Sequence, residues 1–245
     1  MRFVCPTMHA EHLHMEPVWS ATRATLERSR LRWTMFVDPL LARIEGFDLA
    51  PVLAWIADHG HEVAMHTHHH KLVGEPGRTT GFVLGEQLSE ADIHRCLQEN
   101  FDYFVERGHV PKGFVSGSWL VLDAIYEWLA AHGFDYDSTL RTYAAAGPWS
   151  SFVDDAQCPT ARRVKGLLEV PTTAPLTPQL KAMVRRSRRS VVLGNLVYDL
   201  YYLHDYDLVR LHKRVAVHLL DRLAPESAAA TVSELARGVA AVVPG

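Results

Sequence analysis

The 245-residue sequence contains few cysteines and no long apolar run. Its three cysteines, Cys5, Cys96 and Cys158, are widely separated and form no CxxC pair, so a disulfide framework is excluded and a reducing compartment is expected. No stretch of about 18 apolar residues could span a membrane, and the first residues do not resemble a signal peptide. These absences predict a cytoplasmic protein without a membrane partner.

An excess of charge of one sign is also missing. The chain has 25 Lys and Arg against 28 Asp and Glu, a balance that excludes nucleic acid as a first expectation for a partner. Neither GxGxxG nor GxxxxGK[ST] follows any expected strand, so the usual nucleotide-binding motifs are absent. What the sequence does have is 15 histidines, the residue that most often ligates metals and transfers protons near neutral pH.

Short β-like runs alternate with helical patterns along the whole chain, without a composition shift that would mark a domain boundary. This alternation predicts an α/β fold, a single irregular (β/α) barrel of TIM type over residues 1–245, with a doubly wound open sheet as the competitor. We expect strands over 3–8, 31–37, 62–65, 114–115, 134–140, 167–170 and 196–203, and helices over 18–30, 49–59, 89–108, 120–132, 179–190, 208–223 and 232–243.

Histidines follow three of these expected strands directly. His9 and Glu11 follow the first strand, His66 and His70 follow the strand over 62–65, and His204 follows the strand over 196–203. The carboxyl ends of barrel strands meet on one face, so these groups are expected to converge. Because His66 and His70 are four residues apart, one helical turn or a tight loop could direct both rings at one metal ion.

Several segments resemble the polysaccharide deacetylase superfamily with the NodB homology domain, carbohydrate esterase family 4. The stretch Trp33–His70, with WTMFV, GHEV and HTHHH, is similar to the family's TFFV, GHEI and H[ST]xxH segments in order and spacing. TMHAEH at Thr7–His12 resembles the TFDxE form of the first motif, and GFDYDS at Gly133–Ser138 resembles GFxYDSS. LHD at Leu203–Asp205 resembles the last motif. The resemblance covers nearly the whole chain and implies a metal-dependent deacetylase.

By this resemblance, Glu11, His66 and His70 hold one divalent metal ion, His9 is the base and His204 the acid. Zinc is the first choice, and cobalt, nickel, manganese or iron are alternatives. GFVSGSW, over 113–119, stands where the family has its third motif. The expected substrate contacts are Ser116, Gly117, Trp119 and Asp137, and backbone N–H groups near the first two are expected to hold the oxyanion.

The sequence departs from the family at two linked positions. His9 stands where the family has its catalytic aspartate, and Val115 stands where it has the arginine that pairs with that aspartate. A neutral histidine needs no cationic partner to accept a proton, so the two changes are mutually consistent. Loss of activity is the alternative interpretation. A further alternative makes His9 a ligand and Glu11 the base.

The expected substrate is a small N-acylated compound that contains a sugar, cleaved to a carboxylate and a free amine. His68 and His69 are interpreted as loop residues, and the basic run from Lys181 to Arg189 as a solvated helix face. Two other functions stay open: a ligand-binding module without activity, and a non-haem metal enzyme using the same two histidines and carboxylate.

Overall fold

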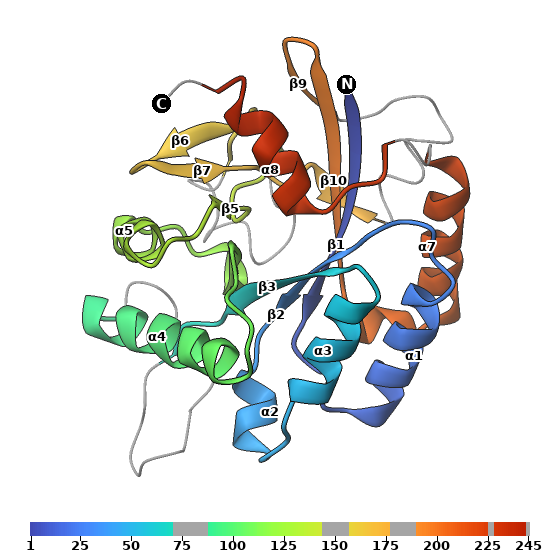
Figure 1. Cartoon of the computed structure of the whole chain (residues 1–245), viewed down its shortest axis with the longest axis vertical. Coiled ribbons are helices and arrows are strands. Elements are labelled where there is room, and N and C mark those ends of the chain that lie inside the picture. The colour runs from blue at the N-terminus through green and yellow to red at the C-terminus, as the bar shows by residue number, and fades with distance from the viewer. Residues whose placement is uncertain (71–87, 144–156, 177–189, 225–227, 244–245) are drawn as a thin grey trace.

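The computed structural model describes residues 1–70, 88–143, 157–176, 190–224 and 228–243. Ten strands form one sheet in the order β6-β7-β5-β4-β3-β2-β1-β10-β8, and β9 pairs with β10. Only β6 and β9 run antiparallel to their neighbours. The sheet curls into an open barrel (Figure 1), which confirms the predicted fold class. The strands are β1 (Arg2–Ala10), β2 (Thr34–Val37), β3 (Glu62–Thr67), β4 (Gly113–Ser116), β5 (Tyr136–Asp137), β6 (Arg162–Val164), β7 (Leu167–Glu169), β8 (Ala174–Pro175), β9 (Val191–Leu193) and β10 (Leu196–His204).

Helices surround the sheet and connect its parallel strands (Figure 1). Ser89 starts the longest of them as predicted, because its side chain and that of Asp92 form a capping box. Within the described ranges, no helix has both the length and the apolar character needed to cross a membrane. The helices are α1 (Glu16–Leu26), α2 (Leu40–Ile44), α3 (Ala50–Asp58), α4 (Glu90–Glu106), α5 (Asp123–Ala131), α7 (Leu211–Leu223) and α8 (Val232–Ala240), with 3₁₀ turns η2 (Gly117–Trp119) and η5 (Asp205–Val209).

The two faces of the sheet bury different side chains because successive strand residues point to opposite sides. Val4 and Met8 of β1 belong to the cluster that packs under the outer helices. Cys5, between them, belongs to a second cluster inside the barrel, where it packs with residues of α8 such as Leu235. Helix α8 therefore fills the end of the barrel at which the parallel strands begin, and leaves the opposite end for polar side chains.

The sequence prediction located the long elements and missed short ones. Helix α2 and strands β6 and β9 have three to five residues each, too few for a periodic pattern to develop. The predicted basic helix over 179–190 lies almost entirely outside the described residues.

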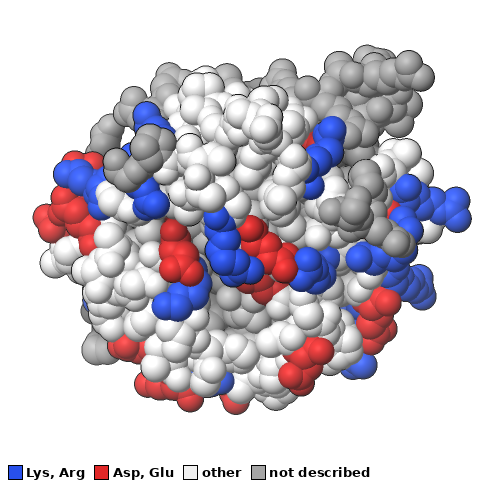
Figure 2. Space-filling view, turned by 45° about the horizontal axis from the view of Figure 1, so that its top comes forward, with Lys and Arg blue, Asp and Glu red and all other residues white. Residues whose placement is uncertain are grey.

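Acidic and basic side chains alternate over the face of the molecule drawn in Figure 2, and neither sign covers it alone. Some surface charges form ion pairs, such as Lys165 with Asp123 and Glu127. On this face the folded chain keeps the charge balance of the sequence.

Two carboxyl groups are buried side by side between the sheet and α5. Asp137 and Glu169 occupy paired positions on β5 and β7, and both are essentially inaccessible to solvent. Thr139 donates to Asp137, while the hydroxyl of Tyr126 donates to Glu169. Burial raises the pKa of Asp137 to about 6, and burial together with the neighbouring Asp137 raises the pKa of Glu169 well above its usual value. The pair therefore retains a shared proton in the folded state.

We expect this pair to make the stability fall as pH rises. Both folded-state pKa values lie above the unfolded values of about 4, so the stabilisation is fully present below about pH 4. The part due to Asp137 is lost as pH rises through about 6, and the part due to Glu169 is lost at higher pH. In Asp137→Asn the amide can donate to Glu169 permanently. We compare the free energy of unfolding of the variant with that of the wild type by urea unfolding. The difference between the two proteins should shift in favour of the variant by at least about 1.4 kcal/mol, the equivalent of one pKa unit, from pH 5 to pH 8.

The matched control is Asp123→Asn, which changes an exposed carboxylate on α5. Its effect on unfolding should be small and equal at the two pH values. A change in stability of Asp137→Asn that is the same at pH 5 and pH 8 would refute the shared proton.

Candidate metal centre

The end of β1 carries two polar side chains on the inner face of the barrel. His9 lies two residues after the inward-facing Thr7, and Glu11 follows two residues later. In the parallel register His9 stands opposite His204 of β10 and Phe36 of β2. The structure thus brings together the first and last predicted histidines.

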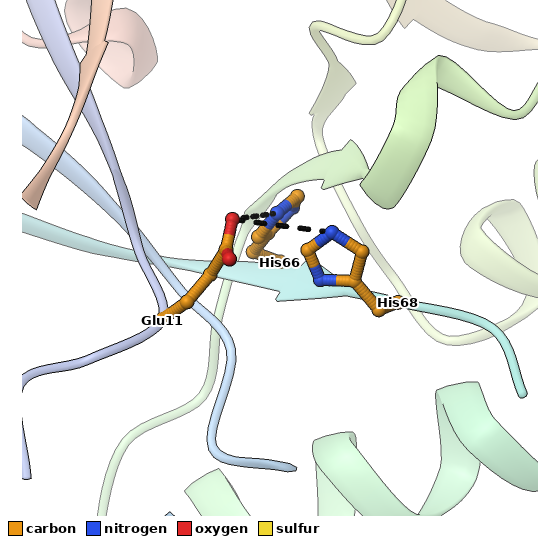
Figure 3. A group of neighbouring side chains, drawn as sticks. All are labelled: Glu11, His66 and His68. Atoms are coloured by element: carbon orange, nitrogen blue, oxygen red, sulfur yellow. Dashed lines mark ion pairs between the residues drawn. The ribbon is translucent and has the colours of Figure 1, made fainter. Parts of the chain in front are cut away.

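A second pair of imidazoles comes from β3. This strand runs as extended chain through Thr67, so the two-residue alternation places His66 and His68 on the same side. Oε1 of Glu11 lies 3.6 Å from Nε2 of His66 and 3.9 Å from Nε2 of His68 (Figure 3). One ligand atom from each of these three residues lies within 4.8 Å of the others, a spacing that one metal ion can bridge.

Hydrogen bonds on the far side of each ring fix its orientation. Nδ1 of His66 donates to the carbonyl oxygen of Val115 at 2.8 Å, and Nδ1 of His68 donates to Oδ2 of Asp38 at 2.9 Å. With Nδ1 held in this way, Nε2 of each neutral ring is the atom that can ligate a metal ion. Two imidazoles and one carboxylate with further positions left open match the donor set of hydrolytic zinc sites.

His70 lies outside this group, although the sequence prediction made it the third ligand. Its Nδ1 lies 3.2 Å from the carbonyl oxygen of His68 and 3.5 Å from Sγ of Cys96. The four-residue spacing assumed a helical turn or a tight loop after β3, whereas the chain remains extended to Thr67. The geometry therefore favours Glu11, His66 and His68 as the ligand set.

Glu11 and the neighbouring histidines stabilise each other's charged forms. Burial alone would raise the pKa of the Glu11 carboxyl, but contact with His66, together with His68 and His204, lowers this pKa to about 2. Burial would lower the pKa of His66, but Glu11 and Asp38 raise it above its usual value. Glu11 thus stays ionised and available as an anionic ligand.

His9 sits at the centre of a ring of aromatic side chains. Its ring centroid lies 4.9 Å from that of His66, 5.1 Å from Tyr202, 5.5 Å from Trp119 and 5.4 Å from His204. Burial, and then the three histidines His66, His204 and His68, hold the pKa of His9 well below its usual value. Burial likewise lowers the pKa of His204. The ring of His9 is therefore neutral and can accept a proton.

The predicted substrate contacts divide into two groups. Trp119 faces His9, and its backbone is held at a φ of 58°, an unfavourable conformation for a large side chain. Gly117 lies against the ring of His68, where a Cβ atom would come within 2.4 Å of Cδ2. In contrast, the N–H of Ser116 already donates to Thr139, and Asp137 belongs to the carboxyl pair under α5.

Sequence reasoning missed several residues that complete the site. Asp38 follows β2 directly, as Glu11 follows β1, so the rule that polar residues after strands converge would have found it. Tyr202 lies two residues before His204 on β10, and the alternation places both on the inner face. His68 lies between the two histidines that the sequence predicts as ligands, in a segment that the sequence analysis interprets as a loop.

Comparison with known proteins shows that this chain is similar to solved structures in its fold alone. No family model matches the sequence, and no curated protein matches it. A candidate polysaccharide deacetylase from Mycobacterium smegmatis superposes with a TM-score of 0.62 at 16% identity, over 97% of this chain and 90% of that one. A family 4 carbohydrate esterase from Streptomyces lividans, solved with acetate, superposes with a TM-score of 0.53 at 16% identity, over 90% of this chain and 86% of that one. The PuuE allantoinase superposes with a TM-score of 0.62 at 12% identity, over 100% of this chain and 91% of that one. The resemblance to polysaccharide deacetylases is thus confirmed at the level of the fold.

The identity of the third ligand can be tested with two alanine variants. His68→Ala should abolish stoichiometric Zn²⁺ binding, because it removes one of the three converging donors. His70→Ala should retain it, since that ring lies outside the group. Zinc binding is measured by competition with a chromophoric chelator. Loss of zinc in His70→Ala with full binding in His68→Ala would restore the sequence-based assignment.

The role of Asp38 generates a further prediction. Asp38→Asn should weaken zinc binding by roughly 10- to 100-fold, the usual effect of losing the hydrogen-bond partner of a ligating histidine. Asp48→Asn is the control: Asp38 and Asp48 both accept a hydrogen bond from the backbone N–H two residues later, but Asp48 is exposed and is paired with Arg107. Equal zinc affinities in the two variants would exclude Asp38 as a positioning group.

Proposed function

We propose that this protein is a metal-dependent hydrolase that removes an N-acyl group from an amino sugar or a sugar-bearing metabolite. The observation that carries the proposal is the convergence of Glu11, His66 and His68 beside the neutral ring of His9. Support also comes from the fold, which this chain has in common with a family 4 carbohydrate esterase that was solved with acetate. The allantoinase with the same fold means that the fold by itself does not decide the substrate.

The donor set fits a divalent ion, for which zinc is our first choice, held by Glu11, His66 and His68. Such an ion would supply Lewis-acid chemistry, polarising the acyl carbonyl and making water more acidic. The protein contributes fixed ligand orientations through Asp38 and the carbonyl of Val115. These contacts hold the Nε2 atoms in place before substrate arrives.

His9 is the proposed base and His204 the proposed acid. The ring of His9 lies next to that of His66 and is inaccessible to bulk solvent, so it can take a proton from an attacking water without competition from solvent. Nε2 of His204 lies 4.0 Å from Oε1 of Glu11, and its side chain is 28% exposed. From that position it can deliver a proton to the leaving amine once it has itself taken one up.

The rings of Trp119 and Tyr202 both lie beside that of His9 and contact each other, with centroids 5.1 Å apart. Aromatic side chains pack well against the apolar faces of sugar rings, so we propose that these two residues bind the sugar. Because the backbone N–H of Ser116 is occupied by Thr139, the oxyanion must be held by other groups than that N–H.

Acetate release from a panel of N-acetylated sugars, measured on metal-free and zinc-loaded protein, tests the activity. The loaded wild type should release acetate and the metal-free protein should not. His9→Ala should keep zinc and lose roughly 100- to 10,000-fold in rate, the usual cost of removing a general base. His94→Ala, on the exposed side of α4, is the control and should match the wild type.

Three other outcomes would replace the proposal with an alternative. Loss of zinc in His9→Ala, with zinc retained but activity lost in Glu11→Gln, makes His9 the ligand and Glu11 the base. Sugar binding without acetate release in any metal form indicates a ligand-binding module. Activity that requires iron and oxygen indicates a non-haem metal enzyme.

A further inference from the structure

Arg141 is the only arginine in the buried class among the residues that the structure describes. Its side chain is 3% exposed, and its Nε and Nη2 atoms have no hydrogen-bond partner. Within the described ranges, no carboxylate lies within ion-pair distance of its guanidinium, whereas Arg2, Arg43 and Arg107 each have one. An arginine stays protonated even when buried, so this position holds an uncompensated cation.

This cation lies next to the proposed active site. Cζ of Arg141 is 4.8 Å from the centre of the Trp119 ring, and the centre of the His9 ring is 5.5 Å from the same ring. Arg141 follows β5 at the same end of the barrel as the histidines, and its backbone bridges to Thr172 just before β8. The guanidinium and the proposed base therefore both lie beside the ring of Trp119.

A second polar group accompanies Arg141. The ring of Tyr143 lies 5.3 Å from Cζ of Arg141, and its buried hydroxyl interacts with Arg141 and with Tyr202. Nε and Nη2 of Arg141 remain without an acceptor beside Trp119. Buried donors normally have partners, so this group requires an acceptor that the described part of the chain does not supply.

We propose that Arg141 and Tyr143 bind an oxyanion of the substrate, a carboxylate or a phosphate, and that the substrate is therefore an acidic N-acylated sugar. A planar guanidinium pairs with both oxyanions through two parallel hydrogen bonds. Cation–π contact with Trp119 holds the guanidinium in place. The identity of the N-acyl sugar rests on the proposed function, but the binding of the anion does not.

Binding is measured by calorimetry on zinc-loaded protein with four probes: inorganic phosphate, N-acetylglucosamine 6-phosphate, the carboxylate sugar N-acetylneuraminic acid, and neutral N-acetylglucosamine. At least one acidic sugar should bind ten times more tightly than the neutral one or better. Arg141→Gln should remove that preference and leave the neutral sugar unaffected, while Arg141→Lys should restore part of it. Arg43→Gln, which changes an arginine paired with Glu99, is the control. The two acidic sugars distinguish a phosphate from a carboxylate.

Stability without ligand separates a substrate-binding arginine from a structural one. If Arg141 has no partner in the free protein, Arg141→Met should melt at the same temperature as the wild type or higher. A large drop in melting temperature would reveal a partner elsewhere in the chain and overturn the proposal. Equal affinity for acidic and neutral sugars would overturn it too.

Failure of this inference and failure of the proposed function give different results. Tight binding of an acidic sugar without release of acetate would preserve the anion site and reject the hydrolase. Release of acetate from neutral sugars with no effect of Arg141→Gln would preserve the hydrolase and reject the anion site.

Discussion

The parallel pairing of β1 with β2 and β10 is the constraint on which the site depends. It puts His9 level with His204 on one side and with Phe36 on the other, and it aligns the ends of the strands at one edge. The two-residue alternation then selects which side chains enter the barrel. A shift of β1 by one residue would turn His9 and Glu11 toward the outer helices and bring Met8 inside. The site therefore forms only in this register of β1.

Within that edge, one carboxylate faces several imidazoles. Oε1 of Glu11 lies 3.6–4.0 Å from the Nε2 atoms of His66, His68 and His204. Such a cluster would be unfavourable if the rings carried charge together, and burial of His9 and His204 favours their neutral forms. A cation at the centre of the cluster satisfies the carboxylate and the lone pairs at the same time. The local electrostatics and the donor geometry thus point to the same kind of ligand.

The sequence predicted the barrel because the alternation of strands and helices is a property of long segments, in which many residues contribute to one pattern. It also predicted that His9, Glu11, His66 and His204 converge, since each follows a strand. It could not distinguish His68 from His70, because that choice depends on where β3 ends, and element boundaries are the least certain part of a sequence pattern. Two contacts favour His68: its hydrogen bond with Asp38, 30 residues earlier in the chain, and the space for its ring beside Gly117, 49 residues later. Contacts between such distant positions leave no local pattern in the sequence.

The two departures from the family motifs acquire a physical explanation when Arg141 is included. Val115 is fully buried in the inner core, so no cation stands at that position, and the neutral ring of His9 does not need one. An aspartate base would remain ionised at neutral pH and would attract any nearby guanidinium into an ion pair. If His9 is the base, as proposed, the neutral ring does not draw the charge of Arg141, which contacts the same Trp119, into an ion pair. The exchange of aspartate for histidine is therefore compatible with a nearby unpaired cation such as Arg141, which agrees with the anion site that we propose.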